Sequence, residues 1–180
     1  MPTRAYILSG GKSSRMGQEK GLVQYNGKPM IQWVIDALKP IAQEITIVSN
    51  SPDYQNLGFE VIADIQKNKG PLGGIATALN HSNNEVNIIL SCDIPEIKTS
   101  TLKMILSNAN AQVTICRQGN QLHPLIGVYR KSSLKTINKQ LETDQLAVMA
   151  ALDLLDLNII DLGSEFAEDF KNINRPENLI

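Results

Sequence analysis

The chain has 180 residues, of which 42% are hydrophobic and 19% charged, so it has the length of one domain and the composition of a folded protein. A formal net charge of −1 gives no support for general nucleic-acid binding. No run approaches the ~18 apolar residues of a membrane span, and the start turns glycine-rich too early for a signal-peptide core. We therefore expect one cytoplasmic domain over residues 1–180, without nucleic-acid or membrane partners.

Cysteine and histidine usage limits the metal chemistry. Cys92 and Cys116 form no C-x-x-C pair, which argues against a disulfide framework or a cysteine zinc site. With only two histidines, an imidazole-based metal cluster is also disfavoured. Any metal would therefore sit on oxygen ligands, which favours Mg²⁺.

Short apolar strands alternate with helical segments along the chain. A strand at 5–8 precedes a glycine loop and a helix over 29–38, and further strands are predicted at 45–48, 59–62 and 86–90. A helix opens at 70–74, and the later half shows helices at 100–108, 132–141 and 145–155 and strands at 112–116, 125–129 and 157–160. This alternation is typical of an α/β fold with a largely parallel sheet.

In open α/β sheets, ligands bind outside the carboxyl ends of the strands. Four polar segments directly follow predicted strands: the glycine loop, the turn 49–52, Asp64 and the turn 92–95. We expect these segments to meet at one edge of the sheet.

The loop Leu8-Ser9-Gly10-Gly11-Lys12-Ser13-Ser14-Arg15-Met16-Gly17-Gln18-Glu19-Lys20 is suited to a phosphate chain. Paired glycines let backbone amides approach phosphate oxygens, and three cations lie within nine residues. The alternative is a flexible surface loop with scattered cations. The loop fits neither the P-loop nor the G-x-G-x-x-G spacing, which disfavours a kinase or an NAD enzyme.

Asp93 lies just beyond a buried strand in a turn that contains Pro95, where its carboxylate could hold Mg²⁺. The alternative is an Asp-x-Pro turn that ends the strand. Neighbouring Cys92 is expected to be a small core residue rather than a nucleophile. Asp64 could accept hydrogen bonds from a base or ribose, but by itself it is more simply an exposed loop acid.

Three further segments have equally simple structural explanations. Residues 70–74 could give a ligand access to backbone at a helix start, or form a tight loop-to-helix connection. His123-Pro124 reads as a turn at a strand edge. Asn172 and Asn174 would by default cap a C-terminal helix.

Taken together, these segments resemble the molybdenum cofactor guanylyltransferase family, within the wider nucleotidyltransferase group. The matching text runs almost from end to end in consistent order: Leu8-Ser9-Gly10-Gly11, Arg15-Met16-Gly17, Lys20-Gly21-Leu22, Gly27-Lys28-Pro29, Gly70-Pro71-Leu72-Gly73-Gly74, Cys92-Asp93-Ile94-Pro95, His123-Pro124 and Asn172-Ile173-Asn174-Arg175-Pro176-Glu177-Asn178-Leu179. Ser9 and Gly73 stand where that family commonly has alanine. A CTP-using relative differs at both of those segments, so this chain is more similar to the GTP form.

The resemblance implies a single-domain, Rossmann-like fold of the nucleotide-diphospho-sugar transferase type, with a mostly parallel twisted sheet and helices on both faces. It implies transfer of GMP from Mg·GTP to molybdopterin, with release of pyrophosphate. The N-terminal half would bind the nucleotide and the C-terminal half the acceptor. Molybdoenzymes or cofactor-delivery proteins would be its protein partners.

The resemblance also implies roles for individual residues. Backbone at Leu8, Ser9, Gly10 and Gly11 would hold the nucleotide, and Asp64 matches a nucleotide-binding acid. Arg15 and Lys20 would neutralise the triphosphate as catalytic cations, and Asp93 would hold Mg²⁺. Because the acceptor phosphate is already ionised, this chemistry needs positioned cations rather than a protein nucleophile.

Two other functions remain open at this point. One is a nucleotidyltransferase that uses another nucleotide, such as CTP, or another acceptor, such as a sugar phosphate or polyol phosphate. The other is a nucleotide-binding adaptor that has lost turnover. Retention of Arg15, Lys20 and Asp93 argues against the adaptor, because a binding module has less need for the Mg²⁺ carboxylate.

Overall fold

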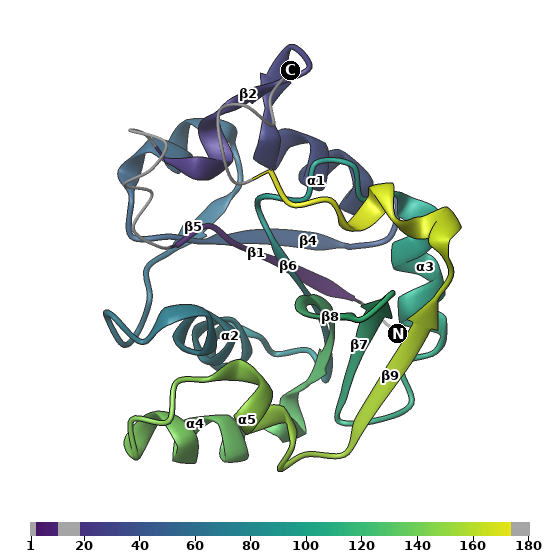
Figure 1. Ribbon diagram of the computed structural model, residues 1–180. Coiled ribbons are helices and arrows are strands. Elements are labelled where there is room, and N and C mark those ends of the chain that lie inside the picture. Colours follow the sequence, from purple (N-terminus) through teal and green to yellow (C-terminus); the bar gives the residue numbers. More distant parts are fainter. Residues whose placement is uncertain (1–2, 11–18, 174–180) are drawn as a thin grey trace.

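A seven-stranded mixed sheet forms the centre of the computed structural model, which describes residues 3–10 and 19–173 (Figure 1). The strands lie in the order β5-β4-β1-β6-β8-β7-β9, and β8 alone runs antiparallel to its neighbours. Their bounds are β1 Arg4–Leu8, β4 Glu44–Val48, β5 Glu60–Ile62, β6 Val86–Ser91, β7 Val113–Gln118, β8 Gln121–Arg130 and β9 Leu157–Leu162. The predicted α/β fold with a mostly parallel sheet is confirmed.

Helices cover both faces of the sheet, as expected (Figure 1). α1 Met30–Leu38 and α3 Thr99–Ser107 pack on one face, and α2 Gly70–His81, α4 Leu134–Glu142 and α5 Val148–Leu152 pack on the other. The apolar stripe of α1 is fully buried, as its helical spacing predicts: Ile31, Val34, Ile35 and Leu38. None of the helices described is both long and apolar enough to cross a membrane.

The parallel register brings the carboxyl ends of four strands to one edge of the sheet. Leu8 at the end of β1 pairs with Val48 of β4 and with Ser91 of β6, and Val48 pairs with Ile62 of β5. The loops that follow these strands therefore leave the sheet side by side. For the residues that the structure describes, this confirms that the polar segments begin at one edge of the sheet.

Two short local structures were not expected from the sequence. The strands β2 Gln24–Tyr25 and β3 Lys28–Pro29 form a hairpin whose turn residues, Asn26 and Gly27, have φ values of 46° and 85°. Two positive φ values are those of a type I′ turn, for which Asn-Gly is a strong signal. A 3₁₀ segment, Pro52–Leu57, follows the turn after β4 and buries Tyr54.

The His123-Pro124 pair lies inside β8 rather than in a turn at its edge. Ile115 of β7 pairs with Gly127 of β8, and the next residue, Cys116, pairs with His123, so Pro124, Leu125 and Ile126 form a bulge on the β7 side. Proline has no amide hydrogen to give to a ladder, and a bulge accommodates it without a lost hydrogen bond. The strand therefore begins four residues earlier than the expected 125–129.

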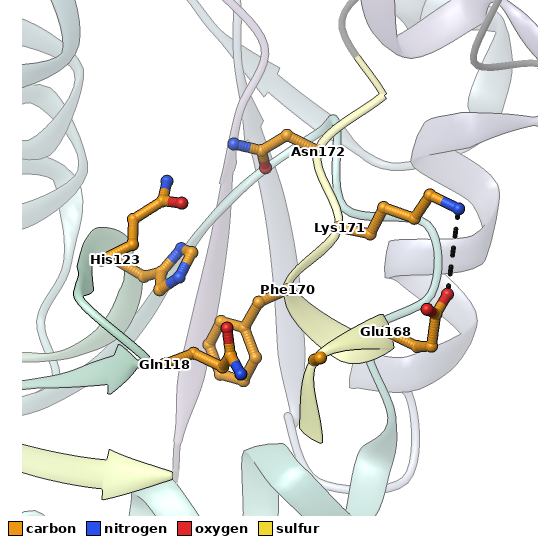
Figure 2. Close-up of a pocket in the computed structure, with 8 residues that line it drawn as sticks. Gln118, His123, Glu168, Phe170, Lys171 and Asn172 are labelled. Atoms are coloured by element: carbon orange, nitrogen blue, oxygen red, sulfur yellow. Dashed lines mark ion pairs between the residues drawn. The ribbon is translucent and has the colours of Figure 1, made fainter. Parts of the chain in front are cut away.

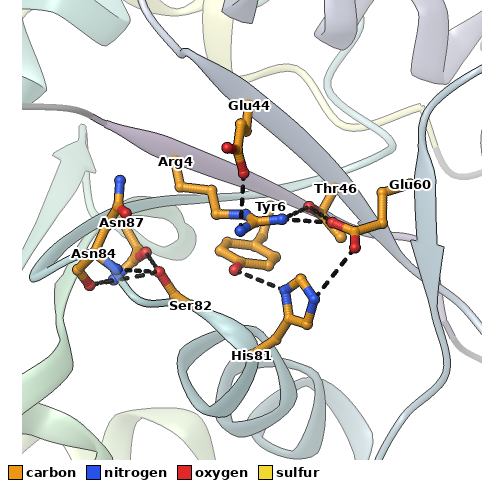
Figure 3. Close-up of polar contacts among 9 residues, drawn as sticks. All are labelled: Arg4, Tyr6, Glu44, Thr46, Glu60, His81, Ser82, Asn84 and Asn87. Atoms are coloured by element: carbon orange, nitrogen blue, oxygen red, sulfur yellow. Dashed lines mark hydrogen bonds and ion pairs between the residues drawn. The ribbon is translucent and has the colours of Figure 1, made fainter.

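A polar network closes the opposite edge of the sheet, at the start of β1 (Figure 3). Arg4 pairs with Glu44 at 2.9 Å and with Glu60 at 2.5 Å, linking β1 to β4 and β5. Glu60 also lies 3.4 Å from His81 at the end of α2, and the other ring nitrogen of His81 lies 3.1 Å from the Tyr6 hydroxyl. One carboxylate thus connects two neighbouring elements to the central strand.

Removal of the Glu60 charge should destabilise the fold in a pH-dependent way. Burial works against ionisation, but the Thr46 hydroxyl, His81 and Arg4 outweigh it and lower the pKa of Glu60. Ionised Glu60 therefore adds stability above the ordinary carboxyl pKa, and this is lost as pH falls through the folded-state value. Glu60→Gln should cost less than about 1 kcal/mol at neutral pH.

Thermal unfolding of both proteins as a function of pH measures this difference. The gap in Tm between the wild type and Glu60→Gln should narrow as pH falls below the usual range of a glutamate. Glu44→Gln, which removes a single and more exposed partner of Arg4, is the matched control and should have a smaller effect. A gap that widens toward acid pH would contradict the assignment.

Candidate functional site

Asp93 and Lys20 form an ion pair at the carboxyl ends of the parallel strands. Asp93 follows β6, and Lys20 begins the 3₁₀ segment Lys20–Leu22. The Lys20 ammonium contacts Oδ2 of Asp93, while the Ser91 hydroxyl donates to Oδ1 at 2.5 Å. Both side chains are largely buried, with 24% and 14% exposed. Two residues that sequence analysis assigned to the same site are thus in contact, although 73 positions separate them.

The end of β1 presents backbone rather than side chains to this edge. The Leu8 carbonyl accepts from the Cys92 amide at 3.2 Å, and the Ser9 amide donates to the Val48 carbonyl at 2.9 Å. Leu8 and Ser9 are buried, whereas Gly10 is exposed. Gly11 and Arg15, and Lys12 of the same loop, lie outside the described residues.

Tyr54 contacts the residues on both sides of the glycine loop, Ser9 and Gly21. The sequence analysis gave it no role. Its fully buried hydroxyl hydrogen-bonds with the Ser9 hydroxyl and accepts from the Gly21 amide at 3.2 Å. A Cβ on Gly21 would lie 2.9 Å from both Ser9 Oγ and Tyr54 Oη. Only glycine fits at position 21. Because the Tyr54 hydroxyl bonds to both Ser9 and Gly21, it connects the end of β1 to the segment that carries Lys20. Burial raises the pKa of Tyr54, which keeps it a neutral phenol.

Asp64 is half-buried and tied to Asn50, not an isolated loop acid. The Asn50 amide donates to Oδ2 of Asp64 at 3.0 Å, and its carbonyl accepts from the Asp64 backbone amide at 3.1 Å. The other carboxylate oxygen, Oδ1, is buried and has no hydrogen-bond partner among the described residues. A Cβ on Gly10 would lie 3.6 Å from Asp64 Oδ2, so the acid lies beside the glycine loop. Burial raises the pKa of Asp64, against the effect of Asn50.

Cys92 is a core residue, as expected. It is 6% exposed, and burial, followed by the charge of Asp93, raises its pKa to about 12. A thiol with that pKa is not a nucleophile at neutral pH. Cys92 and Cys116 are both free.

The glycines at 70–74 serve packing at the start of α2. Gly70 has a φ of 60°, which glycine adopts readily. A Cβ on Gly73 would lie 2.7 Å from Cβ of Lys69, and one on Gly74 would lie 3.4 Å from the Leu8 side chain. These contacts support the tight-connection interpretation of this segment over the ligand-access one.

Two adjoining cavities lie on the β8 side of Asp93. One of about 360 Å³ is lined by Gln118, Gln121, His123, Ala167, Glu168, Phe170, Lys171 and Asn172 (Figure 2). The other, of about 170 Å³, shares Gln121, His123 and Asn172 with it and also includes Ser91 and Asp93. The shared residues connect the larger cavity to the Asp93 carboxylate.

A C-terminal strap, residues 164–173, forms one wall of these cavities. Asp169 on the strap is 1% exposed and accepts from Thr101 at 2.5 Å and Lys98 at 2.7 Å, which fastens the strap to α3. At its far end, the Ile173 amide donates to the Asp93 carbonyl at 2.9 Å. Asn172 lies in this extended segment and caps no described helix, while Asn174 lies outside the described residues. Sequence analysis gave no role to Asp169.

The acid at position 93 is a suitable ligand for Mg²⁺. No group of three or more His, Cys, Asp or Glu side chains in the described part of the chain could hold a metal unaided. Mg²⁺ is usually held by one or two carboxylates together with substrate phosphates and water, and does not need a protein cage. A single, preorganised carboxylate beside a lysine therefore fits a metal that arrives with a polyphosphate.

Comparison with known proteins agrees with this geometry. Residues 5–155 match the model of the MobA-like NTP transferase domain. A protein of Flavobacterium johnsoniae named "Probable molybdenum cofactor guanylyltransferase" is 43% identical, and the alignment covers 97% of this chain and 93% of that protein. A protein of the same name from Carboxydothermus hydrogenoformans is 34% identical over 97% of this chain and 87% of its own length.

Solved structures show the same fold. Molybdopterin-guanine dinucleotide biosynthesis protein A from Archaeoglobus fulgidus superposes with a TM-score of 0.82 at 23% identity, over 98% of this chain and 94% of that one. A CMP:2-keto-3-deoxy-manno-octonic acid synthetase complexed with CTP superposes with a TM-score of 0.76 at 14% identity, over 99% and 95%. With a family model that covers most of its length and full-length relatives above 30% identity, this chain belongs to the MobA-like NTP transferase family.

Proposed function

We propose that this protein transfers GMP from Mg·GTP to molybdopterin, forming molybdopterin guanine dinucleotide and pyrophosphate. The observation that carries the proposal is the Lys20–Asp93 pair at the carboxyl ends of the parallel strands, beside the Gly10 backbone and Asp64. The names of its relatives supply the substrates, because full-length proteins at 43% and 34% identity are described as guanylyltransferases of the molybdenum cofactor.

The nucleotide half of the site is the edge formed by β1, β4 and β5. Because the Leu8 carbonyl and the Ser9 amide already extend the sheet, the Gly10 backbone is the main candidate for contact with guanine. Asp64 would accept a hydrogen bond from the nucleoside, and the unpartnered state of its buried Oδ1 supports this role. Gly11 and Arg15 keep the roles that the family resemblance implies, in nucleotide binding and in triphosphate neutralisation.

The reaction needs charge neutralisation more than proton transfer. A terminal phosphate oxygen of molybdopterin bonds to the α-phosphorus of GTP, and the bond to the bridging oxygen of pyrophosphate breaks. Asp93 would hold Mg²⁺, which would supply Lewis-acid stabilisation of the charge on the phosphates. Lys20 contributes a fixed cation to the same position, and the Ser91 hydroxyl holds the carboxylate in orientation.

The acceptor half of the site lies under β8 and the C-terminal strap. The two cavities there lead to Asp93, as acceptor binding requires, because the acceptor phosphate has to reach the α-phosphorus. We therefore assign nucleotide binding to the N-terminal half and acceptor binding to the C-terminal half of one domain over 1–180. The product is a cofactor, so we expect a cytoplasmic enzyme that hands it to molybdoenzymes or delivery proteins.

A pyrophosphate-release assay tests the function directly. The purified protein with Mg²⁺ and molybdopterin should release pyrophosphate from GTP, and at least about tenfold more slowly from CTP or ATP, because a polar site discriminates between bases. Equal rates with CTP, or turnover with a sugar phosphate instead of molybdopterin, would replace the proposal by another nucleotidyltransferase. GTP-dependent thermal stabilisation without any turnover would indicate a binding adaptor.

Asp93→Asn should lower kcat at least about 100-fold while the protein stays folded, because the metal loses its charged protein ligand. The change keeps the shape of the side chain but removes the charge that faces the largely buried Lys20, so Tm should fall, and circular dichroism checks that the variant remains folded. Asp36→Asn is the matched control, since Asp36 is also paired with a lysine, Lys28 at 2.5 Å, but on the exposed side of α1. Wild-type turnover in Asp93→Asn would remove this residue from the mechanism.

Two glycine variants separate support of the loop from contact with the nucleotide. Gly21→Ala would force a methyl group against Ser9 and Tyr54, so it should cost about 1–3 kcal/mol of stability. Gly10→Ala meets only an ordinary 3.6 Å contact, so it should leave Tm nearly unchanged and weaken GTP binding. Chemical denaturation and GTP titration measure the two effects, and the reverse pattern would contradict the assignment.

A further inference from the structure

His123 carries a buried hydrogen-bonding atom that nothing in the described structure satisfies. The residue is 7% exposed, yet its Nε2 atom is buried and has no hydrogen-bond partner among residues 3–10 and 19–173. Buried polar atoms of side chains are satisfied in most folded proteins, because an unmade bond costs free energy. An unsatisfied atom at the wall of a cavity is therefore a candidate contact for a ligand.

The backbone holds His123 in this position. It pairs with Cys116 at the end of the bulge in β8, and the next residue, Pro124, accepts a 2.5 Å hydrogen bond from the Tyr129 hydroxyl through its carbonyl. Tyr129 is fully buried. The imidazole is thus attached to a strand of the main sheet, directly beside the bulge.

The Phe170 ring of the strap packs beside the imidazole. The two ring centroids are 4.7 Å apart at an interplanar angle of 50°, and Phe170 is 4% exposed. Burial lowers the pKa of His123, so its ring is neutral at physiological pH and carries one donor and one acceptor nitrogen. A neutral ring suits a neutral ligand group better than a phosphate.

Three other side chains of the larger cavity are also neutral and polar. Gln118, Gln121 and Asn172 each offer an amide donor and an amide acceptor, and Lys171 is paired with Glu168 at 3.9 Å (Figure 2). A cavity of about 360 Å³ with this lining fits a flat heterocycle with alternating donors and acceptors on its edge. The Lys20–Asp93 ion pair lies at the other end, beyond the smaller cavity.

We propose that Nε2 of His123 hydrogen-bonds to the pterin ring system of the acceptor and sets its place in the cavity, so that the phosphate end points toward Asp93. This assignment rests on the proposed acceptor, molybdopterin. It makes His123 a specificity-determining residue for the acceptor, without a part in binding GTP or the metal.

Binding of 6-hydroxymethylpterin, a fluorescent pterin without phosphate, tests the assignment apart from turnover. His123→Phe keeps a ring against Phe170 and removes both nitrogens, so Kd for this probe should rise at least about tenfold, the loss expected for one buried hydrogen bond. His123→Gln restores a polar group and should recover most of the affinity. Thermal stabilisation by GTP should be unchanged in both variants, and KM for molybdopterin should rise while kcat changes little.

The wild-type chain provides a second test that does not depend on variant folding. It has two histidines, and His81 lies at the opposite edge of the sheet, between Tyr6 and Glu60. In a ¹⁵N-histidine-labelled protein, saturation with 6-hydroxymethylpterin should shift the Nε2 signal of His123 and leave His81 unchanged. His81→Gln is the matched control and should bind the pterin like the wild type.

The outcomes keep this inference and the proposed function distinct. An unshifted His123 signal, or unchanged pterin affinity in His123→Phe, overturns the inference even if GMP transfer to molybdopterin is found. His123-dependent pterin binding without GMP transfer supports the inference and overturns the proposed reaction.

Discussion

The constraint on which the site depends is the double pairing of β1. This buried strand is hydrogen-bonded to β4 on one side and β6 on the other, and its register places Leu8, Val48 and Ser91 at the same level. Buried backbone groups must stay paired, so the ladder continues for one residue beyond the strand on each side, through Ser9 and Cys92. The chain segments part only after that point. Gly10 and Asp93 therefore emerge at the same edge of the sheet.

Buried, uncharged residues beside this edge hold the segment that carries Lys20. Tyr54 contacts the end of β1 and the amide of Gly21 at once, so the segment bearing Lys20 is attached to the sheet through an uncharged hydroxyl. Lys20 and Asp93 form an ion pair there, and the Ser91 hydroxyl also donates to Asp93. The Lys20 and Asp93 side chains can be largely buried because their opposite charges neutralise one another where water is scarce.

The C-terminal strap makes non-covalent contacts with α3, with His123 of β8 and with Asp93. Asp169 anchors it on α3, Phe170 packs against His123, and the Ile173 amide holds the carbonyl of Asp93. The site is consequently polarised along its length. The Lys20–Asp93 ion pair lies where phosphates would react, while amides, a neutral imidazole and the Lys171–Glu168 pair line the end that would receive a heterocycle.

Strand and helix positions followed from hydrophobic periodicity, because buried strands and amphipathic helices need apolar residues at fixed spacings. The edge of the sheet at which Asp93, Asp64 and Gly10 lie was also predicted, since parallel strands align their carboxyl ends. Tyr54, Asp169 and the orientation of His123 were not. The roles of Tyr54 and Asp169 arise from contacts between residues far apart in the chain, such as Gly21–Tyr54 at 33 positions, Ser9–Tyr54 at 45 and Lys98–Asp169 at 71. Short-range sequence patterns do not encode such contacts. They depend on the tertiary structure, in which β8 contains a bulge and the C-terminal strap packs against α3 and His123.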